Sequence, residues 1–211
     1  MIDLVVLLAF VPAVAAIVVS PGPDSIYTLT QSLSGGRATG LAASLGTATG
    51  VLVHTAAAVL GLSAILRTTA SAYLLVKYLG AAYLVYLGVQ LLRSEEQFDL
   101  GTDAGTAEQS LAGSYRKAVA INVSNPQVAV FVLAFFPQFV PPSTTAPLQL
   151  SLLGVVYAGL SLLYLAGVAL FASRVRHFLL DSARTQRLVR YASGSVLIGF
   201  GAKLALEGRP A

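Results

Sequence analysis

The chain has 211 residues, of which 56% are hydrophobic and only 10% are charged, and its mean hydropathy is +0.78. Soluble domains carry about 25% charged residues, so the composition excludes an ordinary soluble protein and predicts an all-α polytopic membrane protein. The net charge of +4 comes mostly from basic residues in short loops, which membrane orientation explains without nucleic acid, and the absence of cysteine excludes disulfides and thiolate metal sites.

The first predicted element is an apolar segment over residues 4–33, interrupted by Ser20-Pro21-Gly22-Pro23-Asp24. A single helix of this length would measure about 45 Å, whereas the hydrocarbon core of a bilayer is about 30 Å thick. Two shorter helices that meet at the break fit better. Because no basic segment precedes the apolar run, we expect a retained first span and not a cleaved signal peptide.

Five further spans are predicted downstream, and a polar connection divides them. They cover residues 39–66, 72–92, 118–140, 148–172 and 191–206, and the fourth is again interrupted, at Asn125-Pro126. The acidic, glycine- and serine-containing stretch 93–117 predicts a flexible linker. The whole chain is then one transporter domain, with a first three-helix repeat over 1–92 and a second over 118–211.

The two halves share a series of residues in the same order, which favours an internal repeat. Because each half has an odd number of spans, the two repeats would have inverted orientations in the membrane, as in many secondary transporters. The matching positions are Val19-Ser20 with Val123-Ser124, Gly50-Val51 with Gly154-Val155, Lys77-Tyr78 with Arg190-Tyr191, and Gly88 with Gly201.

Basic residues predict the orientation of the spans. Nine of the thirteen fall on one side of the predicted membrane and four on the other, so the positive-inside rule places the nine in the cytoplasm and both termini outside. The nine are Arg37, Arg93, Arg116, Lys117, Arg174, Arg176, Arg184, Arg187 and Arg190, and the four are Arg67, Lys77, Lys203 and Arg209.

The two helix breaks predict a binding site. Proline has no N–H and frees a backbone carbonyl in the preceding turn, while Asn125-Pro126 has the order of a helix start. Helix N-termini attract anions and freed carbonyls attract cations, so together they suit an amino acid zwitterion. The alternative is that the prolines only kink packed helices. The candidate substrate-binding residues are Ser20, Pro21, Gly22, Pro23, Asp24, Asn125 and Pro126.

Asp24 and His54 are the two ionisable candidates within the spans. A carboxylate inside a membrane is expensive and indicates a function. Asp24 could bind an ammonium group, carry a coupling proton or cap the second half-helix. His54 could pair with Asp24 or relay a proton, and the more common alternative is a hydrogen bond between helices.

Other chemistries have no support in the sequence. There is no P-loop, no GxSxG and no HExxH motif, which argues against ATP-driven transport and hydrolytic enzymes. The two histidines, His54 and His177, fall in different environments and predict no metal site. We therefore expect neither an enzyme nor a cofactor.

At these residues the chain resembles the LysE/RhtB family of amino acid exporters. The resemblance covers nearly the whole length, and its most specific part is the Ser20–Asp24 motif. Gln127 stands where the family often has lysine, and Ala118 where it often has glycine. Further matching segments are Gly36-Arg37, Gly40, Gly46, Gly50, His54, Gly61, Lys77-Tyr78-Leu79-Gly80-Ala81-Ala82-Tyr83-Leu84, Gly88, Asn125-Pro126 and Phe135-Phe136-Pro137-Gln138-Phe139.

The resemblance implies export of amino acids or close derivatives across the plasma membrane, driven by the proton gradient. Gln127 leaves the charge preference of the site open. The alternatives are a metal-ion exporter of related architecture, a membrane-embedded enzyme or lipid-handling protein, and a scaffold. The expected partners are an amino acid, a proton and membrane lipid, and a homo-oligomer is compatible with the sequence.

Overall fold

The computed structural model describes residues 4–20, 22–68, 70–93, 110–140, 143–180 and 183–206, and these form helices joined by short turns, with no strand among them. This confirms the all-α prediction. The elements are α1 (Leu4–Val19), α2 (Pro23–Ser34), α3 (Arg37–Thr68), α4 (Ala70–Arg93), α5 (Leu111–Val123), α6 (Pro126–Val130), the π-helix η1 (Phe131–Phe135), the 3-10 helix η2 (Phe136–Phe139), α7 (Ala146–Leu170), α8 (Ala172–Leu180) and α9 (Ala183–Leu206).

Both predicted breaks are present as bends between helices. The axis turns by 56° between α1 and α2, and by 55° between α5 and the segment that follows Pro126. In the described part of the chain, α3 and α7 are long and apolar enough to cross a membrane by themselves, and the number of spans rises to four if each bent pair counts as one.

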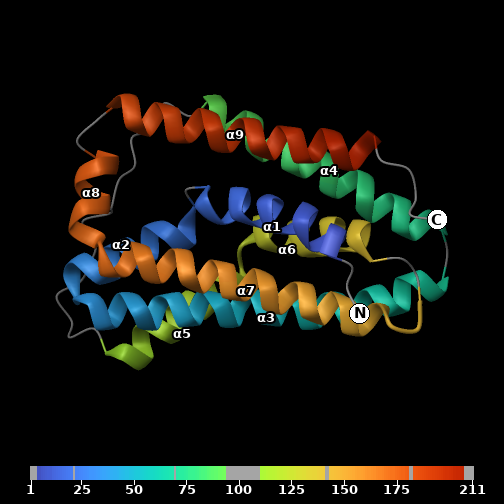
Figure 1. The fold of residues 1–211 in the computed structure, drawn as a ribbon, viewed down its shortest axis with the longest axis horizontal. Helices are drawn as coiled ribbons and strands as arrows, with labels where there is room; N and C mark the ends of the chain where they lie inside the picture. Colours follow the sequence, from blue (N-terminus) through green and yellow to red (C-terminus); the bar gives the residue numbers. More distant parts are fainter. Residues whose placement is uncertain are drawn as a thin grey trace.

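The helices pack in a bundle with two well-defined sets of neighbours (Figure 1). Helices α4 and α9 run along each other on one side, and α3 packs against both α5 and α7 on the other. The α1 helix and the segment that begins with α6 lie between these two sets. The first half-helix of one bent pair, α1, and the second half-helix of the other, which begins with α6, therefore lie near the middle of the bundle, between the long helices.

Glycines allow the long helices to approach closely. A Cβ added at Gly46 of α3 would collide with the backbone carbonyl of Tyr115 and lie 2.7 Å from the Ala118 Cβ in α5. A Cβ added at Gly50 would lie 2.5 Å from the Asn122 side-chain oxygen. The four-residue spacing of these two glycines is the small-xxx-small pattern that is typical of close helix packing.

Aromatic rings fill the core behind the second break. Phe131 and Phe136 are fully buried, and they make edge-to-face contacts with each other and with Tyr157 of α7. Phe10 of α1 packs edge-on against Phe136 with 5.2 Å between ring centroids. Such pairs stabilise a core beyond the area that they bury, and here they fix α1 against the segment after the second break.

Two helix starts and one additional helix differ from the sequence prediction. Helix α5 begins at Leu111, seven residues before the expected start of the fourth span, because Ser110 caps it by accepting a hydrogen bond from the Gly113 N–H at 3.0 Å. The end of the predicted linker is therefore helical, while 94–109 lie outside the described residues. Helix α9 begins at Ala183 and not at 191, since its arginine-rich first turns remain helical beyond the apolar stretch. Helix α8 was not predicted.

Candidate functional site

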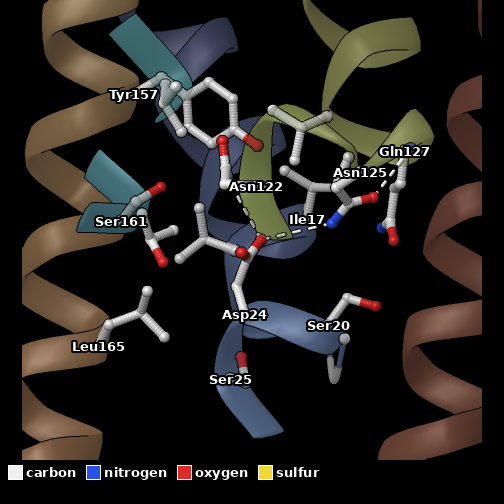
Figure 2. Close-up of a pocket in the computed structure, with 15 residues that line it drawn as sticks. Ile17, Ser20, Asp24, Ser25, Asn122, Asn125, Gln127, Tyr157, Ser161 and Leu165 are labelled. Atoms are coloured by element: carbon white, nitrogen blue, oxygen red, sulfur yellow. Dashed lines mark hydrogen bonds between the residues drawn. The ribbon is translucent and has the colours of Figure 1, made fainter. Parts of the chain in front are cut away.

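The two helix breaks meet at one cavity inside the bundle (Figure 2). The cavity leaves about 40 Å³ for the centres of water-sized molecules, which exceeds the roughly 10–15 Å³ that one water needs. It is lined by Ile17, Val18, Ser20, Gly22, Asp24, Ser25, Thr47, Val51, Asn122, Asn125, Gln127, Val128, Tyr157, Ser161 and Leu165.

Asp24 lies at the centre of this cavity, in the first turn of α2 (Figure 2). Its Oδ2 accepts hydrogen bonds from the amide groups of Asn122, at 3.0 Å, and Asn125, at 3.3 Å. Its other oxygen, Oδ1, is buried without a hydrogen-bond partner in the described structure. Asp24 is also the single carboxylate residue among the described positions. The cavity thus holds a carboxylate with one oxygen fixed and one oxygen open to a ligand.

Asn125 orients its amide toward Asp24 by capping α6. The Asn125 Oδ1 accepts a hydrogen bond from the Gln127 backbone N–H at 3.0 Å, and Pro126 occupies the first helical position. The amide nitrogen therefore points to Asp24 (Figure 2). The predicted order of N-cap followed by proline is confirmed. By contrast, Gly22 stands at the N-cap of α2, so Asp24 does not occupy that capping position.

Asn122 links Asp24 to His54. Asn122 is 1% exposed. The Asn122 backbone carbonyl lies 3.0 Å from His54 Nε2, and it also accepts a hydrogen bond from the Asn125 N–H at 2.9 Å. Proline at 126 cannot donate to this carbonyl, as the sequence predicted. Because a carbonyl only accepts, the His54 Nε2 carries the hydrogen. Like the Asp24 Oδ1, the Asn122 Oδ1 is buried without a partner in the described structure.

The bond from His54 predicts the outcome of a substitution pair. We expect His54→Gln to keep export near the wild-type rate, because a glutamine amide can donate to the Asn122 carbonyl. We expect His54→Leu to lower thermal stability by about 0.5–1.5 kcal/mol, since the Asn122 carbonyl loses one of its two hydrogen bonds and keeps the one from the Asn125 N–H. Transport and melting assays of both variants measure this. A His54→Gln protein that is stable but inactive would assign the ring a role in proton transfer.

The structure brings together most of the residues predicted for the site. Ser20, Gly22, Asp24 and Asn125 line the cavity. Pro23 and Pro126 do not line it, because they are the exposed first residues of α2 and α6. His54 also stands outside the lining and makes the interhelical hydrogen bond. Pro21 lies outside the described residues.

Sequence reasoning missed several polar side chains of the cavity. They come from α3, α5 and α7, where each stands isolated among apolar neighbours, and this isolation was the available signal. These residues are Thr47, Asn122, Tyr157 and Ser161. In the described part of the chain, no group of three histidine, cysteine or acidic residues could hold a metal ion.

A second polar contact ties α2 to α5 away from the cavity. The Ser114 hydroxyl donates to the side-chain oxygen of Gln31 at 2.7 Å, and both residues are buried. The Gln31 backbone carbonyl accepts from Thr39 at 2.8 Å. The first bond holds the half-helix that carries Asp24 against the half-helix that carries Asn122, and the second holds it against α3.

Comparison with known proteins identifies related chains. The model of the LysE type translocator family matches residues 15–208. A homoserine/homoserine lactone efflux protein of Salmonella typhimurium is 32% identical over 186 residues, which cover 88% of this chain and 89% of that protein. An uncharacterised membrane protein of Pseudomonas aeruginosa is 35% identical over 204 residues, which cover 93% of this chain and 93% of that protein. An uncharacterised membrane protein of Vibrio cholerae is 30% identical over 203 residues, which cover 96% of this chain and 98% of that protein. No solved structure matches.

Proposed function

Because the chain belongs to the LysE type translocator family and is a membrane transporter, not an enzyme, we propose that it exports small amino acids or their close derivatives across the plasma membrane. The observation that carries this proposal is the shared cavity of the two helix breaks, in which Asp24 is bonded to amides 98 and 101 residues away. The substrate site lies in this cavity, between α2 on one side and α5 and α6 on the other.

The free acceptors of the cavity suit a substrate ammonium group. Asp24 Oδ1 and Asn122 Oδ1 are both buried and accept no hydrogen bond in the described structure, and the Thr47 hydroxyl of the same cavity is the nearby protein donor that is also unpaired. Buried acceptors without donors cost free energy. An ammonium group carries three donors and satisfies both oxygens. The N-terminus of α2, which starts beside the cavity at Pro23, favours the substrate carboxylate.

The homoserine efflux protein suggests which amino acids to test first. Homoserine and its lactone are small and carry an amino group, and homoserine adds a hydroxyl group. The hydroxyl groups of Ser20 and Ser161 and the side-chain amide of Gln127 line the cavity, and they can exchange hydrogen bonds with a polar substrate side chain. A neutral amide at Gln127 favours substrates with an uncharged side chain.

The proposal includes six spans in two inverted repeats. The spans are α1 with α2, α3, α4, α5 with the helices up to Phe139, α7 and α9, while α8 lies outside the membrane core. At 24 residues each, α4 and α9 are about 36 Å long, enough to cross a bilayer. Their contact is reciprocal, because Gly88 meets Gly194 and Gly201 meets Ala81, which supports the repeat.

We further propose proton antiport through Asp24. Because Asp24 is the carboxylate that faces the cavity, it can bind either the substrate ammonium group or a proton. Competition between the two at one carboxylate links export of substrate to entry of a proton. The polar bonds from Asn122 and Asn125 keep the carboxylate in place in both states.

Transport by the purified protein tests the function. We expect proteoliposomes that contain the protein to move radiolabelled homoserine down an imposed gradient faster than empty liposomes, and to accelerate when the pH is lower on the receiving side. Lysine and glutamate serve as charged competitors. An absence of flux for every neutral amino acid, with flux for a metal ion or a lipid, would contradict the proposal.

The orientation of the chain is tested by reporter fusions. Figure 1 places the turn between α2 and α3, the start of α5 and α8 at one end of the bundle, and the start of α4 and the end of α9 at the other. We expect a phosphatase fused at Ala211 to be active outside the cytoplasm, and a phosphatase inserted after His177 to be inactive. The reverse pattern would overturn the proposed orientation.

A further inference from the structure

A second cavity, separate from the site of Asp24, lies at the end of the bundle where α8 is found. Its volume is about 280 Å³. The turn between α2 and α3 forms one wall and the junction of α7 and α8 forms the other. The residues that line it are Ser32, Arg37, Ala169, Leu170, Phe171, Ala172, Ser173 and Arg174.

The polar lining of this cavity is cationic. Arg37 and Arg174 both face it, and neither forms an ion pair with a carboxylate in the described part of the chain. Asp24, the carboxylate that the structure describes, lines the other cavity. Both arginines are exposed, so water and salt screen their mutual repulsion, and an anion that lies between them is attracted by both charges. The hydroxyl groups of Ser32 and Ser173 add hydrogen-bonding capacity.

The cavity lies where four helices begin or end. Helix α3 begins at Arg37, immediately after Gly36, whose φ of +88° lets the chain turn sharply into the helix. Helix α8 begins at Ala172, on the opposite wall. The first N–H groups of α3 and α8 lie at this cavity, and so do the last turns of α2 and α7, whose dipoles have the opposite sign. The helix dipoles therefore offset one another, and the two arginines supply the attraction for an anion.

The rim of the cavity is apolar and exposed. Leu170 is 42% exposed and Phe171 is 54% exposed. The Arg174 guanidinium lies over the Phe171 ring at 5.8 Å from its centroid, which holds the charge beside the apolar surface. Helix α8 lies across the end of the bundle (Figure 1) and alternates arginines with apolar residues. Such a helix rests in the interface between lipid headgroups and acyl chains.

We propose that this cavity binds the phosphate group of an anionic phospholipid. The phosphate oxygens accept hydrogen bonds from Arg37 and Arg174, since guanidinium groups match the geometry of phosphate. The exposed side chains of Leu170 and Phe171 contact the acyl chains of the same lipid. Binding would join the α2–α3 turn to the α7–α8 junction, which belong to different halves of the chain.

Binding of defined lipids to the full-length protein tests the proposal. The purified protein is titrated in detergent with phosphatidylglycerol, phosphatidylcholine or inorganic phosphate, and binding is followed by native mass spectrometry and by the melting temperature. We expect phosphatidylglycerol to bind and raise the melting temperature. We expect Arg37→Gln/Arg174→Gln to weaken that binding by about tenfold or more, because hydrogen bonds to charged groups are lost.

The matched control is Arg116→Gln, which removes an exposed arginine of α5 that does not line the cavity. This variant should bind phosphatidylglycerol as the wild type does. The single variants Arg37→Gln and Arg174→Gln should each have an intermediate affinity, which provides a test if the double variant does not fold. Equal binding by the wild type and all arginine variants would overturn the proposal. Equal stabilisation by inorganic phosphate and phosphatidylglycerol would also overturn it, since the ligand would then be a free anion.

Discussion

Replacing Asp24 by asparagine is expected to reduce export by about 10- to 100-fold, which corresponds to the loss of a hydrogen bond from a charged group. The amide has nearly the size of the carboxylate, and its oxygen can still accept from Asn122 and Asn125. An amide, however, does not take up a coupling proton as a carboxylate does. Its NH2 group also places donors at the position where Asp24 Oδ1 now offers an acceptor to the substrate ammonium group. The variant therefore loses the charge and keeps the shape of the site.

Proteoliposome flux with and without an imposed pH gradient distinguishes the roles of Asp24. If Asp24 carries the proton, residual flux no longer responds to the pH gradient. If Asp24 binds only the ammonium group, affinity falls while the response to pH persists. Ser34→Ala, an exposed change on the same helix α2, serves as the control for expression and reconstitution. Unchanged flux that still responds to pH would remove Asp24 from the mechanism.

Replacing Gly46 by alanine is expected to have the largest effect on stability. The added methyl group would collide with the backbone carbonyl of Tyr115, and backbone cannot rotate away as a side chain can. Overpacking of this kind costs about 1–3 kcal/mol. The neighbouring Ala118 already contributes a methyl group from α5, so the space between α3 and α5 depends on Gly46 alone at this position. Separation of these helices would also move Asn122 away from Asp24.

Gly61→Ala is the matched control in the same helix. Among the described residues, a Cβ at Gly61 meets no atom within 4 Å, and alanine is a better helix former than glycine by about 1 kcal/mol. We therefore expect Gly61→Ala to melt at or above the wild-type temperature and Gly46→Ala to melt below it. Melting temperatures and monodispersity in detergent measure the difference. Equal stability of the two variants would show that α3 and α5 can move apart without loss.

Local signals in the sequence were sufficient to predict the positions of the two helix breaks. Pro23 and Pro126 each stand at the first position of a helix, and Asn125 provides the cap that its side chain predicts. These features depend on backbone chemistry within a few residues, so they can be read without the rest of the fold. The close approach at Gly46 and Gly50 follows in the same way from the spacing of small residues.

Contacts between segments that are distant in the chain could not be predicted from the sequence. The partners of Asp24 could not be named, because Asn122 looks like any polar residue in a span until α5 is placed beside α2. The early start of α5 and the presence of α8 were also missed. The first turns of α5 and the whole of α8 carry charged residues. A hydropathy pattern detects the apolar part of a span, and it does not detect polar helical turns that extend beyond the apolar part.

The bonds between Asp24 and the two asparagines have a consequence for synthesis of the protein in the cell. The carboxylate is made first, and its amide donors are made 98 and 101 residues later. At a translation rate of about 5–20 residues per second, the delay is roughly 5 to 20 s. During this time a nascent chain holds an unsatisfied acid near the membrane, where a charged group without a partner is costly. Until the second half is made, we expect Asp24 to be neutralised by a proton or to stay in contact with water, and a first half made alone to be less stable in the membrane than the whole chain.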